Sequence, residues 1–76
     1  MKHKEGDWSV STIIHPLLGW LWETAVSRPE HGSGGPFAKY NWKPVERYDD
    51  EEAAKIGHDK WVGLMREDPH RRLPDV

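Results

Sequence analysis

The pattern that most constrains the fold of this chain is a single amphipathic helix near its end. Asp49 or Asp50 suits the N-cap position, and the acidic residues that follow complement the helix dipole. At about 100° per residue, one stripe of this helix is largely apolar and comprises Ala54, His58, Trp61 and Met65. Pro69 ends the pattern. We therefore predict a helix over residues 50–67 that must bury this stripe against another element.

Two earlier segments alternate between apolar and polar residues, which is typical of strands with one buried face. The first spans residues 8–14, and its predicted buried face carries Trp8, Val10, Thr12 and Ile14. The second spans residues 20–27, and its predicted buried face carries Trp20, Trp22, Thr24 and Val26. The short connection between them suits a hairpin, so we expect the two strands to pair antiparallel.

The segment between the second strand and the helix contains a predicted loop and a third strand. Residues 29–44 are rich in glycine and proline, which predicts a long loop. Residues 45–48 form a short predicted strand, in which alternation places Val45 and Arg47 on the same face.

These elements predict an α+β fold: a small antiparallel sheet of about three strands, in the order β-β-loop-β-α, with the C-terminal helix packed on one face. We expect one small domain over residues 1–76, with flexible tails at residues 1–7 and 69–76. Trp61 and Met65 are expected to pack on the strand face that carries Trp20, Trp22 and Val26.

Composition excludes several classes of protein. The chain has 76 residues, no cysteine and a formal net charge of −2. Without cysteine there is no disulfide, no thiolate nucleophile and no cysteine zinc site. A net charge near zero gives no general attraction to nucleic acid or to an anionic membrane, and no apolar run approaches the ~20 residues of a membrane span. We expect a soluble protein in a reducing compartment.

The residues that carry chemistry do not form a recognisable catalytic or metal site. His58 could act as a metal ligand or a general base. The alternative that we favour is a structural histidine bonded to a strand carbonyl, with Gly57 allowing the helix to approach the sheet, because no second histidine follows at i+4. For Glu23 we expect an edge position or a salt bridge to Arg47. We predict no enzyme, no cofactor and no metal site with three or more protein ligands.

Three segments carry a combined motif. Residues 10–12 read V-S-T, residues 22–26 read W-E-T-A-V, and residues 47–62 follow R-Y-x-x-x-E-x-A-x-x-G-H-x-x-x-V. In order and spacing this motif resembles small proteins encoded by tailed bacteriophages, a family without an assigned activity, and the resemblance touches about half of the chain. It implies a phage origin, and with it the host cytoplasm, rather than a chemistry. The chain departs from the family pattern at residues 13–20 and 25–27.

The predicted long loop contains an aromatic cluster of Phe37, Tyr40 and Trp42, interleaved with Lys39 and Lys43. Large aromatic side chains form the energetic centres of protein interfaces. Aromatics beside lysines can also stack on single-stranded nucleic acid. In a third alternative the loop folds over the open sheet face and buries the cluster, because an uncovered aromatic face would be sticky.

We therefore predict a small non-enzymatic protein-binding module, a phage-encoded accessory protein that acts on a host or phage protein in the infected cell. Its predicted docking residues are Phe37, Tyr40 and Trp42, helped by the exposed edge of a strand. The first alternative is a minor virion or assembly protein, which should co-purify with particles. The second is a nucleic-acid or metal-binding module, which only the histidines and the aromatic cluster support. We expect neither a nucleic acid nor a membrane as the partner.

Overall fold

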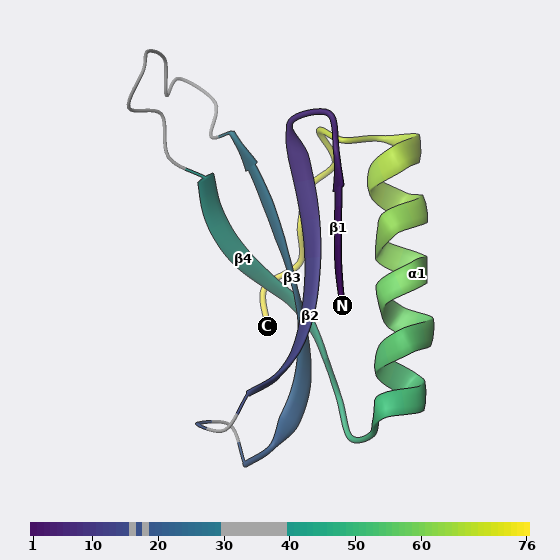
Figure 1. The fold of residues 1–76 in the computed structure, drawn as a ribbon. Helices are drawn as coiled ribbons and strands as arrows, with labels where there is room; N and C mark the ends of the chain where they lie inside the picture. Colours follow the sequence, from purple (N-terminus) through teal and green to yellow (C-terminus); the bar gives the residue numbers. More distant parts are fainter. Residues whose placement is uncertain (16, 18, 30–39) are drawn as a thin grey trace.

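The computed structural model describes residues 1–15, 17, 19–29 and 40–76, and at residues 40 and 41 it describes the backbone alone. Within these residues, one antiparallel sheet of four strands in the order β1-β2-β3-β4 packs one face against a helix (Figure 1). The elements are β1 Lys2–Glu5, β2 Trp8–His15, β3 Leu21–Pro29, β4 Tyr40–Tyr48 and α1 Glu51–Glu67. The predicted α+β class is confirmed, with four strands instead of about three.

β1 corrects the prediction of a flexible tail over residues 1–7. Residues 2–5 pair antiparallel with residues 8–11 of β2. The turn between the strands contains Gly6 at φ 58°, a conformation that carries no steric penalty for glycine. The sequence did not reveal this strand because an edge strand with exposed side chains needs no apolar residues.

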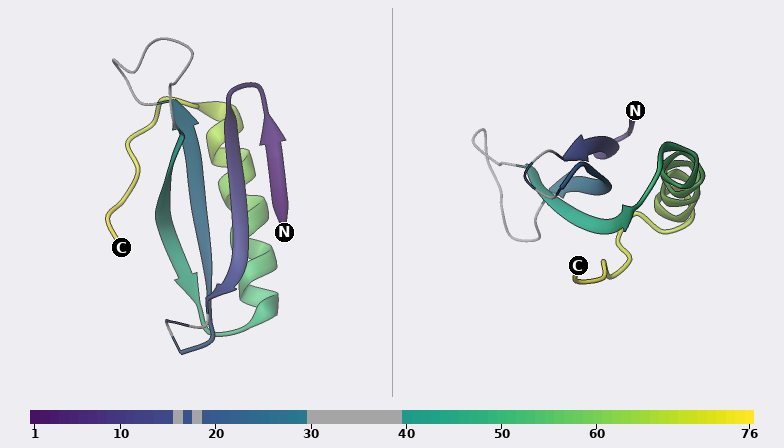
Figure 2. Two further views of the ribbon diagram at one scale, coloured as in Figure 1. Left: turned by 60° about the vertical axis from the view of Figure 1, so that its left-hand side comes forward. Right: turned by 90° about the horizontal axis from the view of Figure 1, so that it is seen from below.

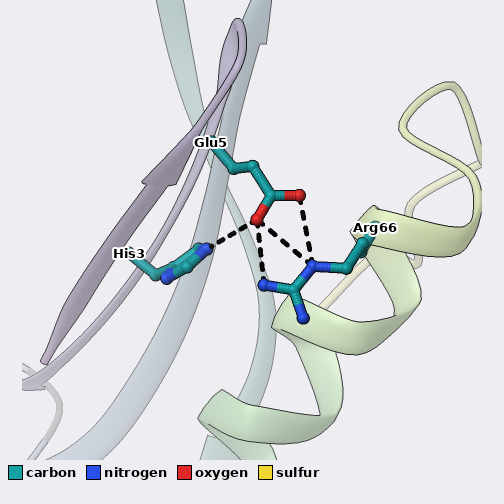
Figure 3. Close-up of polar contacts among 3 residues, drawn as sticks. All are labelled: His3, Glu5 and Arg66. Carbon is teal, nitrogen blue, oxygen red and sulfur yellow. Dashed lines mark hydrogen bonds and ion pairs between the residues drawn. The ribbon is translucent and has the colours of Figure 1, made fainter.

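An ion pair holds the end of β1 against the last turn of α1 (Figure 3). The Arg66 guanidinium donates from Nη2 to Glu5 Oε1 at 2.9 Å and from Nε to both carboxylate oxygens at 3.2 Å. These bonds to Arg66 lower the pKa of Glu5, and His3 Nε2 lies 3.3 Å from the same carboxylate. Because His3 and Glu5 face the helix, the alternate residues Lys2 and Lys4 face the other side of the sheet.

β2 and β3 form the predicted antiparallel hairpin. Val10 pairs with Val26 and Thr12 pairs with Thr24, and all four side chains are fully buried on the face that α1 covers. The prediction was wrong at Trp20, which lies in the turn at φ 65° with its side chain 68% exposed. The turn extends one residue further than the alternation indicated, so β3 begins after Trp20.

β4 corrects the boundaries of the loop predicted over residues 29–44. Pro29 is the last residue of β3, and residues 40–44 belong to β4. Residues 30–39 of the predicted loop lie outside the described part of the chain. Pro44 is tolerated in β4 because an edge strand needs hydrogen bonds on one side only.

A bulge in β4 separates two residues that the alternation placed on one face. Thr24 of β3 pairs with Glu46, and the next residue of β3 pairs with Pro44, so Val45 is the extra residue. Val45 turns into the core and is 4% exposed, whereas Arg47 lies on the other face of the sheet. Alternation along one strand does not reveal a bulge, because a bulge is a property of two paired strands.

The core lies between α1 and the helix-facing residues of β2, β3 and β4. It comprises Trp8, Val10, Val26, Val45, Trp61 and Met65. Trp61 and Met65 therefore share the core with Val26 as predicted, but with Trp8, Val10 and Val45 in place of Trp20 and Trp22. The helix starts as predicted, because the carboxylate of the N-cap Asp50 accepts a hydrogen bond from the Ala53 amide at 2.8 Å.

The last residues run beside β4 without regular secondary structure (Figure 2). The Arg28 guanidinium donates to the carbonyls of Pro69 and Arg71, at 3.1 and 2.6 Å, and Leu73 packs against the core. The prediction of a flexible tail over residues 69–76 missed these contacts, because the atoms that hold this segment belong to β3 and to the core.

We predict that Trp61→Ala lowers the free energy of unfolding by about 3–5 kcal/mol, because it removes an indole that is only 6% exposed. A domain of this size has a total stability of roughly 4–11 kcal/mol, so the variant should be close to unfolding. Trp20→Ala is the matched control, since that indole lies in solvent. Urea denaturation, monitored by circular dichroism, measures the free energy of unfolding of both variants. Equal values for the two variants would contradict the assigned core.

Gly57 faces Tyr48, and a methyl group at Gly57 would overlap the Tyr48 ring and hydroxyl. We predict that Gly57→Ala destabilises the protein, although alanine favours a helix over glycine by about 1 kcal/mol. At Gly63 an added Cβ meets nothing within 4 Å, so Gly63→Ala should stabilise by about 0.5–1 kcal/mol. Thermal denaturation measures the stability of both variants. A gain in stability at both positions would show that the Tyr48 ring can move aside at little cost in free energy.

Candidate docking surface on the open face of the sheet

α1 covers one face of the sheet, and no other described helix or strand covers the second face, which we call the open face (Figure 2). Strand register identifies the residues that point to it. They include Lys2 and Lys4 of β1, Ser9, Ser11, Ile13 and His15 of β2, Glu23, Ala25 and Ser27 of β3, and Trp42, Pro44 and Arg47 of β4.

The structure describes the side chain of one of the three predicted docking residues. Trp42 lies on the open face and is 46% exposed. Tyr40 lies in β4, where its backbone pairs with Pro29, and its side chain is outside the described atoms. Phe37 lies outside the described residues. Of the predicted cluster, Trp42 is therefore the residue that the structure connects to a surface.

Trp42 reaches across the open face to the opposite edge of the sheet. Lys2 Nζ lies 5.7 Å from the centre of the Trp42 ring, which is a cation–π contact. β2 and β3 lie between these two residues, so both side chains must extend over the central strands. The central strands permit this because their residues there are small, namely Ser9, Ser11, Ala25 and Ser27.

A half-open hollow of about 330 Å³ adjoins Trp42. Its lining residues are Ser11, Ile13, His15, Glu23, Ala25, Trp42 and Pro44. Ile13 is 51% exposed, so both Ile13 and Trp42 present apolar surface to solvent. Because the hollow is half open to solvent and its volume is near the lower limit of small-ligand pockets, it suits one side chain of a partner better than an enclosed substrate.

Glu23 places a carboxylate in the hollow. The side chain is largely buried, and its Oε2 accepts a hydrogen bond from Arg47 Nε at 3.0 Å. The predicted salt bridge is confirmed, and the alternative of an edge position is wrong because β3 lies inside the sheet. The ion pair compensates a carboxylate that would be costly to bury without a partner.

His15 ends β2 at the hollow. Its Nδ1 is buried and has no hydrogen-bond partner among the described residues. A buried polar atom without a partner costs free energy.

His58 belongs to the core and not to the open face. It is 7% exposed, its Nδ1 lies 2.7 Å from Thr12 Oγ1, and Thr12 Oγ1 lies 2.6 Å from Thr24 Oγ1. The structural role is confirmed, but the predicted partner was wrong, because His58 bonds a threonine hydroxyl instead of a strand carbonyl. Burial first, then the nearby N-terminal ammonium and His3, lower the pKa of His58 against the opposite effect of Asp59.

The alternation over residues 8–14 places Ser9 and Ser11 on the face opposite Val10 and Thr12, but no pattern in the sequence indicated Lys2 and Lys4, since β1 carries no apolar signal. In the described part of the chain, no helix is long and apolar enough to cross a membrane, and no three histidine or acidic side chains are grouped to hold a metal ion. Comparisons with protein-family models, curated proteins and solved structures find no match.

We predict that the protein loses stability as the pH falls below about 6.5, the pKa of a histidine in the unfolded chain. His58 has a lower pKa when folded, so the unfolded state binds more protons as the pH falls from about 6.5 toward that lower value. Above this window the stabilising effect is fully present. Urea denaturation between about pH 7.5 and about pH 5 measures the loss. The variant His58→Gln removes this titration, so an equally steep loss in that variant would assign the effect to other groups.

Proposed function

We propose that this chain is a small non-enzymatic protein-binding module that docks a partner protein on the open face of its sheet. The observation that carries the proposal is the Trp42 indole, which is 46% exposed beside an apolar hollow. Tryptophan is enriched among the residues that dominate the energy of protein interfaces. A large aromatic side chain on a sheet face that no other described helix or strand covers is therefore a natural centre for such an interface.

The environment of Trp42 supports docking. The Lys2 ammonium lies over the indole, and small residues of β2 and β3 lie between the two side chains. An indole that is already ordered loses less conformational entropy when a partner binds. The adjoining hollow offers a place for a partner side chain.

The resemblance to small tailed-phage proteins supports a setting for this function. In that setting the chain is a phage-encoded accessory protein that acts on a host or phage protein in the host cytoplasm. A minor virion or assembly protein is the alternative. The two differ in a simple observation, because an accessory protein remains in the soluble fraction of infected cells, whereas a virion component co-purifies with particles.

We predict that Trp42→Ala weakens capture of the partner by about 30-fold or more, which corresponds to about 2 kcal/mol for an interface hot spot. The thermal stability should change little, because the indole contributes nothing to the helix-facing core. The wild-type chain and the variant are immobilised, challenged with host lysate, and compared by quantitative mass spectrometry.

Trp20→Ala is the matched control, since it removes an exposed indole from the turn between β2 and β3. A protein that wild type and Trp20→Ala both retain, and that Trp42→Ala loses, supports docking on the open face. Capture that is unchanged in Trp42→Ala would place the interface elsewhere. Unfolding of Trp42→Ala would instead show that Trp42 is needed for stability.

A further inference from the structure

The two sides of the molecule carry opposite charge. On the open face, the described strand residues provide three cations, Lys2, Lys4 and Arg47, and one carboxylate, Glu23. On the helix side, seven exposed acidic residues lie on or beside α1, namely Asp49, Asp50, Glu51, Glu52, Asp59, Glu67 and Asp68, against three exposed cations of α1, Lys55, Lys60 and Arg66. A chain with a net charge of only −2 therefore presents a basic face.

Two of the cations on the open face have no anionic partner within the described residues. Arg47 is paired with Glu23, whereas neither Lys2 nor Lys4 belongs to an ion pair. The register of β1 on β2 turns His3 and Glu5 toward α1, so both ammonium groups lie on the open face. Among the described residues, no carboxylate neutralises these two ammonium groups, so both can attract an anion from solution.

The spacing of the two lysines matches an extended chain. Lys2 and Lys4 are two residues apart on one strand, which is about 7 Å. Side chains at alternate positions of an extended peptide repeat at the same interval. Two carboxylates in such a peptide can therefore meet both ammonium groups. An apolar side chain beside them would reach the indole that Lys2 contacts.

From this juxtaposition we infer that the partner docks an acidic segment on the open face, with alternate carboxylates against Lys2 and Lys4 and an aromatic or aliphatic side chain in the hollow beside Trp42. The inference rests on the proposed function and adds the chemistry of the partner. Single-stranded nucleic acid fits less well, because it needs several phosphate contacts and a series of stacking side chains. The described residues of the open face offer two unpaired ammonium groups and one exposed indole.

The test uses the whole chain and three fluorescent probes. The first is a short peptide of glutamates around one phenylalanine, the second replaces its glutamates by lysines, and the third is an oligothymidylate. Fluorescence anisotropy measures binding at ionic strengths from about 0.05 M to about 0.5 M. We expect the glutamate peptide to bind more tightly than either other probe, and its affinity to fall as salt rises.

Charge reversal identifies the groups that bind. Lys2→Glu combined with Lys4→Glu should weaken binding of the glutamate peptide by about tenfold. Lys55→Glu is the matched control for each single reversal, Lys2→Glu and Lys4→Glu, since Lys55 is an exposed lysine on α1, on the opposite side of the sheet. Trp42→Ala should weaken binding of the glutamate peptide while preserving its salt dependence. Circular dichroism confirms that each variant is folded.

Three results would overturn the inference. The first is absence of binding to the glutamate peptide, and the second is an equal effect of Lys55→Glu and of each single reversal at Lys2 and Lys4. The third is tighter binding of the lysine peptide or of oligothymidylate. If the lysine peptide binds and Trp42→Ala removes that binding, the open face still docks protein and only the inferred acidity of the partner fails. Capture from lysate that is independent of Trp42 removes the proposed function itself.

Discussion

The burial of one helix against one face of the sheet is the contact on which the rest of this structure depends. Trp61 and Met65 of α1 meet a buried face of Trp8, Val10 and their neighbours, and this apolar core joins the helix to β2, β3 and β4. A chain this small buries a modest fraction of its surface, so a single such interface must supply most of its stability. Within residues 1–15, 17, 19–29 and 40–76, no further helix covers the opposite face.

The interface between helix and sheet also depends on a close contact at a glycine and on hydrogen bonds between buried polar side chains. Gly57 leaves room for Tyr48, which a larger residue would displace. His58, Thr12 and Thr24 satisfy one another inside the core, where unpaired polar atoms would be costly. The stripe that alternation and helical period identify as buried therefore includes polar residues, because hydrogen bonds compensate their burial.

The same architecture explains the proposed site. Because His3 and Glu5 are turned toward α1, Lys2 and Lys4 are turned away from it. Trp42 extends from the other edge strand to meet Lys2 over a central region of small side chains. An exposed indole, an apolar hollow and two ammonium groups without an ion-pair partner among the described residues come together on one surface, although the indole and the ammonium groups belong to opposite edge strands.

The sequence by itself determined the features that depend on local periodicity. These are an N-cap at one of the two adjacent aspartates, Asp49 or Asp50, the buried stripe of α1 and the central hairpin. Tertiary structure alone decided that residues 2–5 form a strand, that Val45 bulges into the core and that Trp20 stays in solvent. It also placed Trp42 beside Lys2. Period-two and helical patterns are encoded along the chain, whereas edge pairing, bulges and contacts across a sheet depend on strands far apart in sequence.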